Sequence, residues 1–439
     1  MNQGDYPTPT INRLSELIPL YRIYPKLCQK RFMLRLKGID LGRILLGIRI
    51  CSYCFAALIS LSVHAAWQQQ WQLELDSGYA QASASPVFAS QDQWLADAAL
   101  RWYPQYHNLQ GQLVALSQSK QKQDNQHDLI LAELFWKTEL AERDLLVGKQ
   151  RIDLGVSYGF RPLDMFLPYR RNPVAIQVEE GVGVFSLSQF SGNGEYALFY
   201  TDSYLATDSE GLQQRGAGLR WYQLSNNSEW QTLAYYDNQR ALNLGGSWVS
   251  TFGDAWEVHA ESRYQQHYRR MVSHLTQTNI GQVAPISEQE FDDGIQALLG
   301  MTWANLAGDN LIVEYWFDNR ALSQQQWQKV ADVSRYLAQQ DGGLNQLRYS
   351  QGAVFNGQNI MQHNVMLHWH RDIDDWQPAF DLMLAPEDGG VIATARLDYE
   401  FVQGWTLGAR LRYLGGADNA VYQLLPESRV GLIKLEGRF

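Results

Sequence analysis

The sequence predicts an all-β protein, a transmembrane antiparallel β-barrel of about 18 strands, with about 16 strands as the alternative. The first observation is that apolar and polar residues alternate with a period of two in almost every segment after Trp67. In the segment 391–401, VIATARLDYEF, the residues from Val391 to Phe401 at odd positions are apolar, and Arg396, Asp398 and Glu400 point the other way. Successive side chains of a strand face opposite sides of a sheet, so each segment has one apolar and one charged face. Segments of about 10 such residues fit a tilted strand that crosses a membrane.

A soluble β-sandwich shows the same alternation, so a second observation is needed to separate the two classes. Aromatic residues stand at the ends of the apolar faces, where a membrane barrel places its interfacial girdles. The polar faces keep charged residues at mid-strand, which suits a water-filled lumen. The sequence therefore favours the membrane barrel. The aromatic positions are Trp71, Tyr79, Trp102, Trp136, Trp221, Trp230, Tyr236, Trp256, Tyr264, Trp303, Trp405 and Tyr413.

The connections between the candidate strands give a third observation. Long connections all follow odd-numbered strands, and the connections after even-numbered strands are short. Outer-membrane barrels have long extracellular loops on one side and short periplasmic turns on the other, so both ends of the barrel are expected in the periplasm. An error of two strands in the count would leave this alternation intact, so a barrel of 16 strands remains the alternative. The sixth candidate strand is 174–187, one short loop helix is expected at 323–340, and the long connections are 81–93, 119–127, 153–173, 202–214, 265–292, 318–359 and 415–428.

Residues 1–65 are expected to be an N-terminal extension and signal peptide, and residues 66–439 the outer-membrane barrel. Residues 50–63 form an uncharged apolar run that is shorter than the roughly 20 residues of a membrane-spanning helix. Basic residues precede this run and small residues follow it, which is the layout of a signal peptide cleaved between Ala65 and Ala66. Met33 is a possible true start, and a signal anchor that stays attached is the alternative.

The stretch 148–165, GKQRIDLGVSYGFRPLDM, is the most distinctive in the chain. It resembles a porin-like outer-membrane β-barrel family of proteobacteria, although Leu154 stands where members often have tryptophan. The resemblance covers about 20 of the 439 residues besides the general barrel pattern. It implies an outer-membrane channel or export pore, and it indicates no particular solute. The matching residues are Lys149, Gln150, Arg151, Gly155, Phe160, Pro162 and Asp164.

The last strand alternates and ends in the aromatic residue Phe439, although Gly437 departs from the usual pattern. This ending resembles the assembly signal of bacterial outer-membrane barrels. The resemblance implies recognition of this strand by the barrel-assembly machinery. The other expected partners are the lipid of the outer membrane and further copies of the chain in a homo-oligomer.

The connection 153–173 is the candidate constriction loop. Its large apolar residues, among them Phe160 and Phe166, are unsuited to a loop in water, so we expect it to fold into the lumen; a plain surface loop is the alternative. Arginine keeps its charge near neutral pH, so a cluster of arginines would favour anionic or polyhydroxylated solutes. We expect Asp164 to fix the loop by pairing with one arginine. The predicted pore residues are Lys149, Arg151, Arg161, Asp164, Arg170, Arg171, Arg410 and Arg412.

Composition and motifs argue against several other functions. The formal net charge of −10 argues against binding of nucleic acid. No local signature of a catalytic site is present, and His368 and His370 have no evident third ligand for a metal, so we expect no enzymatic activity, cofactor or metal. The prediction is a porin-like channel of the bacterial outer membrane that passes small or anionic or polyhydroxylated solutes. An export conduit for a polysaccharide or lipid transport system is the second hypothesis, and a barrel-embedded hydrolase is the third.

Overall fold

The structure is a computed structural model that describes residues 67–121, 124–166, 172–206, 213–340 and 344–439. The chain divides into two compact units, Met1–Ala65 and Ala66–Phe439. The predicted signal peptide, its cleavage between Ala65 and Ala66 and the start at Met33 lie outside the described residues.

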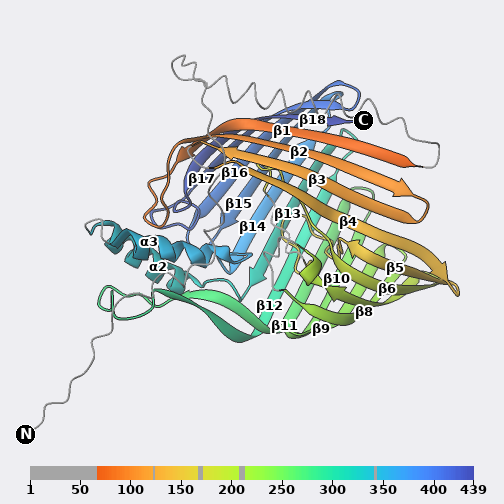
Figure 1. Cartoon of the computed structure of the whole chain (residues 1–439), viewed down its shortest axis with the longest axis horizontal. Coiled ribbons are helices and arrows are strands. Elements are labelled where there is room, and N and C mark those ends of the chain that lie inside the picture. Colours follow the sequence, from red (N-terminus) through yellow and green to blue (C-terminus); the bar gives the residue numbers. More distant parts are fainter. Residues whose placement is uncertain (1–66, 122–123, 167–171, 207–212, 341–343) are drawn as a thin grey trace, which may run out of the picture. The chain divides into compact units, whose positions relative to one another are not determined.

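Eighteen antiparallel strands form one closed barrel, in which each strand pairs with its neighbours in the sequence and β1 pairs with β18 (Figure 1). The predicted fold class and the count of 18 strands are confirmed, and the alternative of 16 is wrong. The strands are β1 (Gln68–Ala82), β2 (Gln93–Tyr106), β3 (Leu109–Lys120), β4 (Gln126–Leu140), β5 (Arg143–Gln150), β6 (Val182–Ser191), β7 (Gly194–Asp202), β8 (Arg215–Ser225), β9 (Ser228–Asp237), β10 (Ala241–Phe252), β11 (Trp256–Ser273), β12 (Ile286–Ala304), β13 (Asp309–Asp318), β14 (His363–Arg371), β15 (Trp376–Ala385), β16 (Gly390–Val402), β17 (Trp405–Gly415) and β18 (Glu427–Arg438).

The expected alternation of connections is also confirmed, since every connection after an even-numbered strand is short. The tightest are two-residue turns such as the one between β4 and β5, where Ala141 and Glu142 both have a positive φ. On the opposite side, the connections after β9 and β15 are short as well. One predicted strand, 174–187, is wrong in its first half, because β6 begins only at Val182. The predicted connection 265–292 is also wrong in its bounds, because β11 continues to Ser273 and β12 begins at Ile286.

The outer face of the barrel is apolar. Leucines of neighbouring strands stand side by side on it, as where Leu198 of β7 lies opposite Leu219 of β8, and both are exposed. Aromatic pairs lie at the side of the short turns, among them Trp71 with Trp102 at 5.7 Å between ring centroids and Trp405 with Phe439 at 6.3 Å. The predicted girdle residues therefore occupy the outer face.

Within the residues that the structure describes, no helix is long and apolar enough to cross a membrane.

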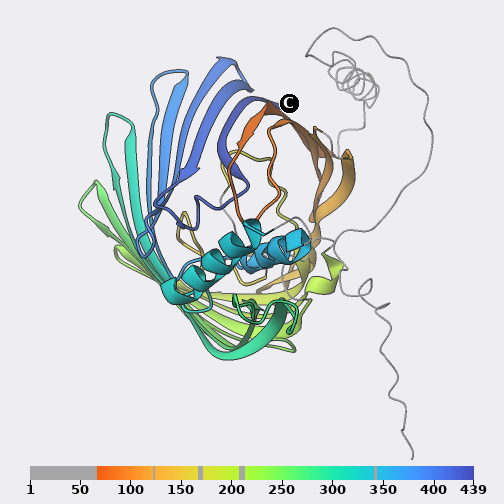
Figure 2. The same ribbon diagram turned by 90° about the vertical axis from the view of Figure 1, so that its left-hand side faces the viewer.

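The connection between β13 and β14 carries the helices α2 (Gln324–Ala338) and α3 (Asn345–Ser350) and the short 3-10 helix η3 (Gln351–Asn356). The predicted loop helix is confirmed as α2, which begins with a capping box between Ser323 and Gln326. Figure 2 shows α2 and α3 lying across the opening of the barrel. A 3-10 turn, η1 (Ser203–Leu205), follows β7.

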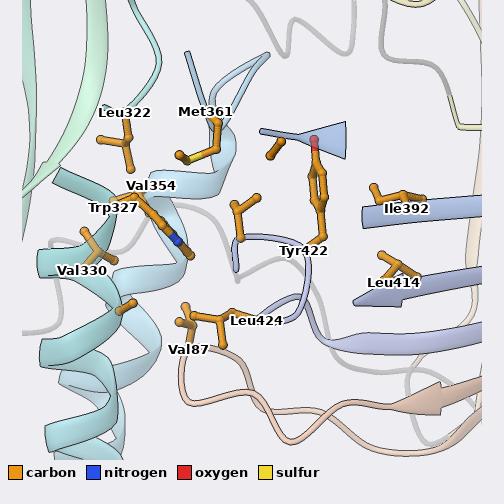
Figure 3. Close-up of a cluster of buried hydrophobic side chains, with 13 residues drawn as sticks. Val87, Leu322, Trp327, Val330, Val354, Met361, Ile392, Leu414, Tyr422 and Leu424 are labelled. Atoms are coloured by element: carbon orange, nitrogen blue, oxygen red, sulfur yellow. The ribbon is translucent and has the colours of Figure 1, made fainter. Parts of the chain in front are cut away.

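An apolar cluster attaches α2 to the barrel and to two neighbouring connections (Figure 3). Trp327 is fully buried at its centre and donates a hydrogen bond of 2.8 Å to the carbonyl of Asn419. Val87 comes from the connection after β1, and Tyr422 and Leu424 come from the connection after β17. The connections after β1, β13 and β17, all on the side of the long loops, thus share one apolar core. We call these three connections together the cap.

Candidate functional site

The described residues of the connection between β5 and β6, 151–166 and 172–181, lie against the inner face of the barrel wall, and we call them the inner segment. Its backbone follows no sheet ladder, so its buried amides and carbonyls need side-chain partners. Strands of the barrel wall supply them. Gln231 of β9, for example, donates a hydrogen bond of 2.8 Å to the carbonyl of Leu154.

Two carboxylates of the wall hold four consecutive amides of the inner segment. Glu261 of β11 accepts hydrogen bonds from the amides of Val156 and Ser157 at 2.5 and 2.7 Å, and from the Ser157 hydroxyl. Glu314 of β13 accepts from the amides of Tyr158 and Gly159 at 2.6 and 2.7 Å. Glu261 and Glu314 are 2% and 0% exposed, so both charges are compensated inside the protein and not by bulk water.

The approach at Gly159 is close enough to exclude any larger residue without a shift of its neighbours. A Cβ atom at this position would lie 2.5 Å from Sδ of Met366 and 3.0 Å from Oε2 of Glu314. Glycine therefore lets the backbone of the inner segment lie directly on β13 and β14.

Asp164 folds the segment back onto itself. Its Oδ1 accepts hydrogen bonds from the amides of Leu154 and Gly155 at 2.9 and 2.8 Å. Arg161 donates to the carbonyl of Ser157 at 2.8 Å and lies 3.4 Å from Oδ2 of Asp164. Burial raises the pKa of the Asp164 carboxyl, and the two amide hydrogen bonds oppose this effect.

Apolar residues of the inner segment cover an apolar patch of the inner wall. The ring of Phe166 meets the ring of Tyr235 edge-on at 5.1 Å, and Phe160 stacks on Trp316 at 5.6 Å. Leu163 is fully buried in the same cluster as Phe166. These contacts explain why a connection in a barrel with a polar interior carries large apolar residues.

The second half of the segment continues along the wall in the order of the strands. Asn172 accepts a hydrogen bond from Arg412 of β17, and Val174 packs on residues of β1 and β18. Ile176 packs on β2, β3 and β4, and Glu180 forms a buried ion pair with Lys149 of β5. Since the first half contacts β9, β11, β13 and β14, the described parts of the inner segment follow most of the circumference from within.

The structure places the predicted pore residues in different surroundings. Lys149 is buried against Glu180, whereas Arg151 is exposed and pairs with Asp153 at 2.8 Å and with Glu179. Arg410 of β17 pairs with Asp398 of the neighbouring strand β16 at 2.7 Å. Arg161 and Asp164 lie together, Arg412 reaches the segment through Asn172, and Arg170 and Arg171 lie outside the described residues.

Sequence reasoning missed the groups that position the segment. Glu261, Glu314 and Gln231 lie on the inward faces of their strands, which the alternation does predict. Their partners are about 77 to 156 residues away along the chain, so no local pattern reveals them.

Among the described residues, no group of three or more His, Cys, Asp or Glu side chains could hold a metal ion.

No protein-family model matches the chain, and no curated protein matches it. Solved structures similar to it include OccK11 (OpdR) of Pseudomonas aeruginosa, with a TM-score of 0.48 and 10% identity over 84% of this chain and 96% of that chain. OccAB1 of Acinetobacter baumannii gives a TM-score of 0.48 and 10% identity over the same shares. A mutant of the porin of Rh. blastica gives a TM-score of 0.38 and 9% identity over 85% of this chain and 100% of that chain.

Proposed function

We propose that the protein is a porin-like channel of the bacterial outer membrane that passes small hydrophilic solutes. The observation that carries the proposal is a closed barrel, apolar outside and charged inside, whose interior is narrowed by a segment held on buried carboxylates. An apolar outer face with aromatic girdles suits the membrane, and a charged inner face suits a water-filled passage.

The passage is proposed to run beside the exposed face of the inner segment. Arg151 there has a side chain that is 44% exposed, and its partners Asp153 and Glu179 are 43% and 37% exposed. Side chains that are this accessible inside a barrel are in contact with water. We propose that Lys149 and Asp164 position the segment behind this face, while Arg151 contacts solutes.

The proposed channel is tested in planar lipid bilayers. Purified protein is expected to produce discrete conductance steps, and proteoliposomes that contain it are expected to swell in small sugars. Neither steps nor swelling from protein that shows the heat-modifiable migration of a folded barrel would contradict the proposal.

Replacing Arg161, Arg170 and Arg171 together with alanine is expected to shift the reversal potential toward cations. Arginines supply fixed positive charge to a passage, and their removal leaves the carboxylates of the lumen in excess. Reversal potentials are measured in a tenfold gradient of potassium chloride. Replacing Arg371, an arginine on the short-turn side, with alanine is the control. If the wild type and the triple variant have equal ion selectivity, these arginines do not face the passage.

The cap favours a second candidate, an export conduit that is closed in isolation. Trp327→Ala would remove the centre of the apolar cluster, and such truncations of buried tryptophans cost about 3–5 kcal/mol. The cap is then expected to open, which is measured as faster proteolysis within residues 319–362 and as higher conductance. Lys329→Ala, on the exposed face of the same helix, is the control. A wild-type barrel that conducts only after Trp327→Ala would favour the conduit over the open channel.

A further inference from the structure

We propose that His368 and His370 of β14 form a binding site for a divalent transition-metal ion, with Tyr158 of the inner segment as the third ligand. The ion expected is one that prefers imidazole nitrogen, such as Zn²⁺. The proposal goes beyond solute passage and does not depend on it, because binding is measured without transport.

The two imidazoles already have the separation that a shared ion requires. His368 and His370 point to the same inner face of β14, and Nε2 of His368 lies 3.2 Å from Nδ1 of His370. Two nitrogens that bind one zinc ion at about 2.0–2.1 Å with a tetrahedral angle are about 3.3–3.4 Å apart. Only a small shift is therefore needed to replace the contact between the rings by two metal bonds.

A carboxylate orients the first histidine. Oδ1 of Asp381, on the neighbouring strand β15, lies 2.8 Å from Nδ1 of His368. A carboxylate can only accept, so Nδ1 carries the proton and Nε2 is the nitrogen with the lone pair, which lies within 3.2 Å of Nδ1 of His370 and 3.1 Å of the Tyr158 hydroxyl. Histidine ligands of metals usually donate their other N–H to a carboxylate, a backbone carbonyl or water. Arg396 lies 3.2 Å from the second oxygen of Asp381 and fixes the carboxylate in turn.

The inner segment supplies the third group. The hydroxyl of Tyr158 lies 3.1 Å from Nε2 of His368, and the two rings are 4.4 Å apart. The backbone amide of Tyr158 donates a hydrogen bond to the carboxylate of Glu314, and this bond keeps Tyr158 in place. The ion can enter from the lumen, because His370 is partly exposed while His368 is only 3% exposed.

The donor set also determines which ions are expected. Two imidazole nitrogens suit Zn²⁺, Ni²⁺ and Cu²⁺, whereas Ca²⁺ and Mg²⁺ prefer the oxygens of carboxylates, carbonyls and water. The arrangement is therefore expected to distinguish Zn²⁺ from Ca²⁺ by affinity alone.

Isothermal titration of the folded barrel in detergent with Zn²⁺ tests the site. One saturable Zn²⁺ site per chain is expected, with no matching heat from Ca²⁺. His368→Gln or His370→Gln is expected to weaken it at least tenfold, and Asp381→Asn, which removes the orienting carboxylate, about 10–100-fold. Tyr158→Phe is expected to weaken it less than either histidine change. His127→Gln, at an exposed position of β4, is the matched control and should leave it unchanged.

Zn²⁺ binding of wild-type strength in the double variant His368→Gln/His370→Gln would overturn the proposal, as would the absence of a saturable site in the wild type. Heat-modifiable migration establishes that each variant is folded. If a histidine variant fails to fold, the wild-type barrel still tests the metal site. Its unfolding temperature should rise with Zn²⁺ and not with Ca²⁺, and equal behaviour with both ions would exclude the site.

Discussion

Changing Glu261 and Glu314 together to glutamine is expected to release the first half of the inner segment and to raise the conductance of the barrel several-fold. Each carboxylate accepts two or more backbone hydrogen bonds in a fully buried place. An amide keeps one acceptor oxygen and turns an N–H group toward the amides of the segment, so at least one buried donor loses its acceptor. Hydrogen bonds to charged groups contribute about 1.5–3 kcal/mol each, so the two changes should destabilise the held segment by at least about 3 kcal/mol.

Single-channel recordings and limited proteolysis measure the two consequences of this change. The double variant should conduct more, and its inner segment should be cleaved faster within residues 151–166. Glu257→Gln is the matched control, because Glu257 lies on the same strand as Glu261 with a side chain that is 41% exposed. Proteolysis and conductance like those of the wild type would show that these carboxylates do not hold the segment in place.

Replacing Lys149 with methionine is expected to lower the free energy of unfolding by about 3–5 kcal/mol, because it leaves the Glu180 carboxylate buried without its cation. Lys149 and Glu180 are 9% and 4% exposed, and the pair joins the end of β5 to the end of the inner segment. The loss should appear as a lower temperature of the heat-modifiable gel shift and as a lower midpoint in denaturant.

Two further variants separate the ion pair from a general effect of losing a lysine. The double variant Lys149→Met/Glu180→Gln should recover most of the loss, since no unpaired charge is then buried. Lys137→Met breaks the pair with Asp144, whose side chains are 56% and 37% exposed, and should cost at most about 1 kcal/mol. Equal losses from Lys149→Met and Lys137→Met would mean that the buried pair contributes no more than a surface pair.

The sequence alone predicted the barrel and the alternation of long and short connections, and it limited the number of strands to about 18 or 16; strand pairing in the structure decided for 18. The reason is local: a strand with lipid on one face and water on the other must alternate, as 391–401 does, whatever strand it pairs with. The helix α2 was predictable for the same reason, because Trp327, Val330 and Leu337 recur at helical spacing on one buried face.

The same pattern misled where two environments produce the same period. Residues 174–181 alternate because Val174, Ile176 and Val178 pack on the inner wall, and this wall replaces lipid as the apolar surface. Alternation with a period of two indicates that one face of the segment is apolar, but it does not indicate whether lipid or protein covers that face. Only the strand pairing, which begins at Val182, distinguishes the two cases.

The tertiary structure alone decided how the site is built. The sequence placed Glu261, Glu314 and His368 on inward faces and placed Tyr158 in a connection, but it did not bring them together. Glu314 lies 156 residues from Tyr158 in the chain, and His368 lies 210 residues from it. Barrel closure sets these contacts, because the pairing of β1 with β18 fixes which inward positions face one another across the lumen. A single strand carries no information about the opposite wall, so its alternation determines the direction of a side chain and the closed barrel determines its partner.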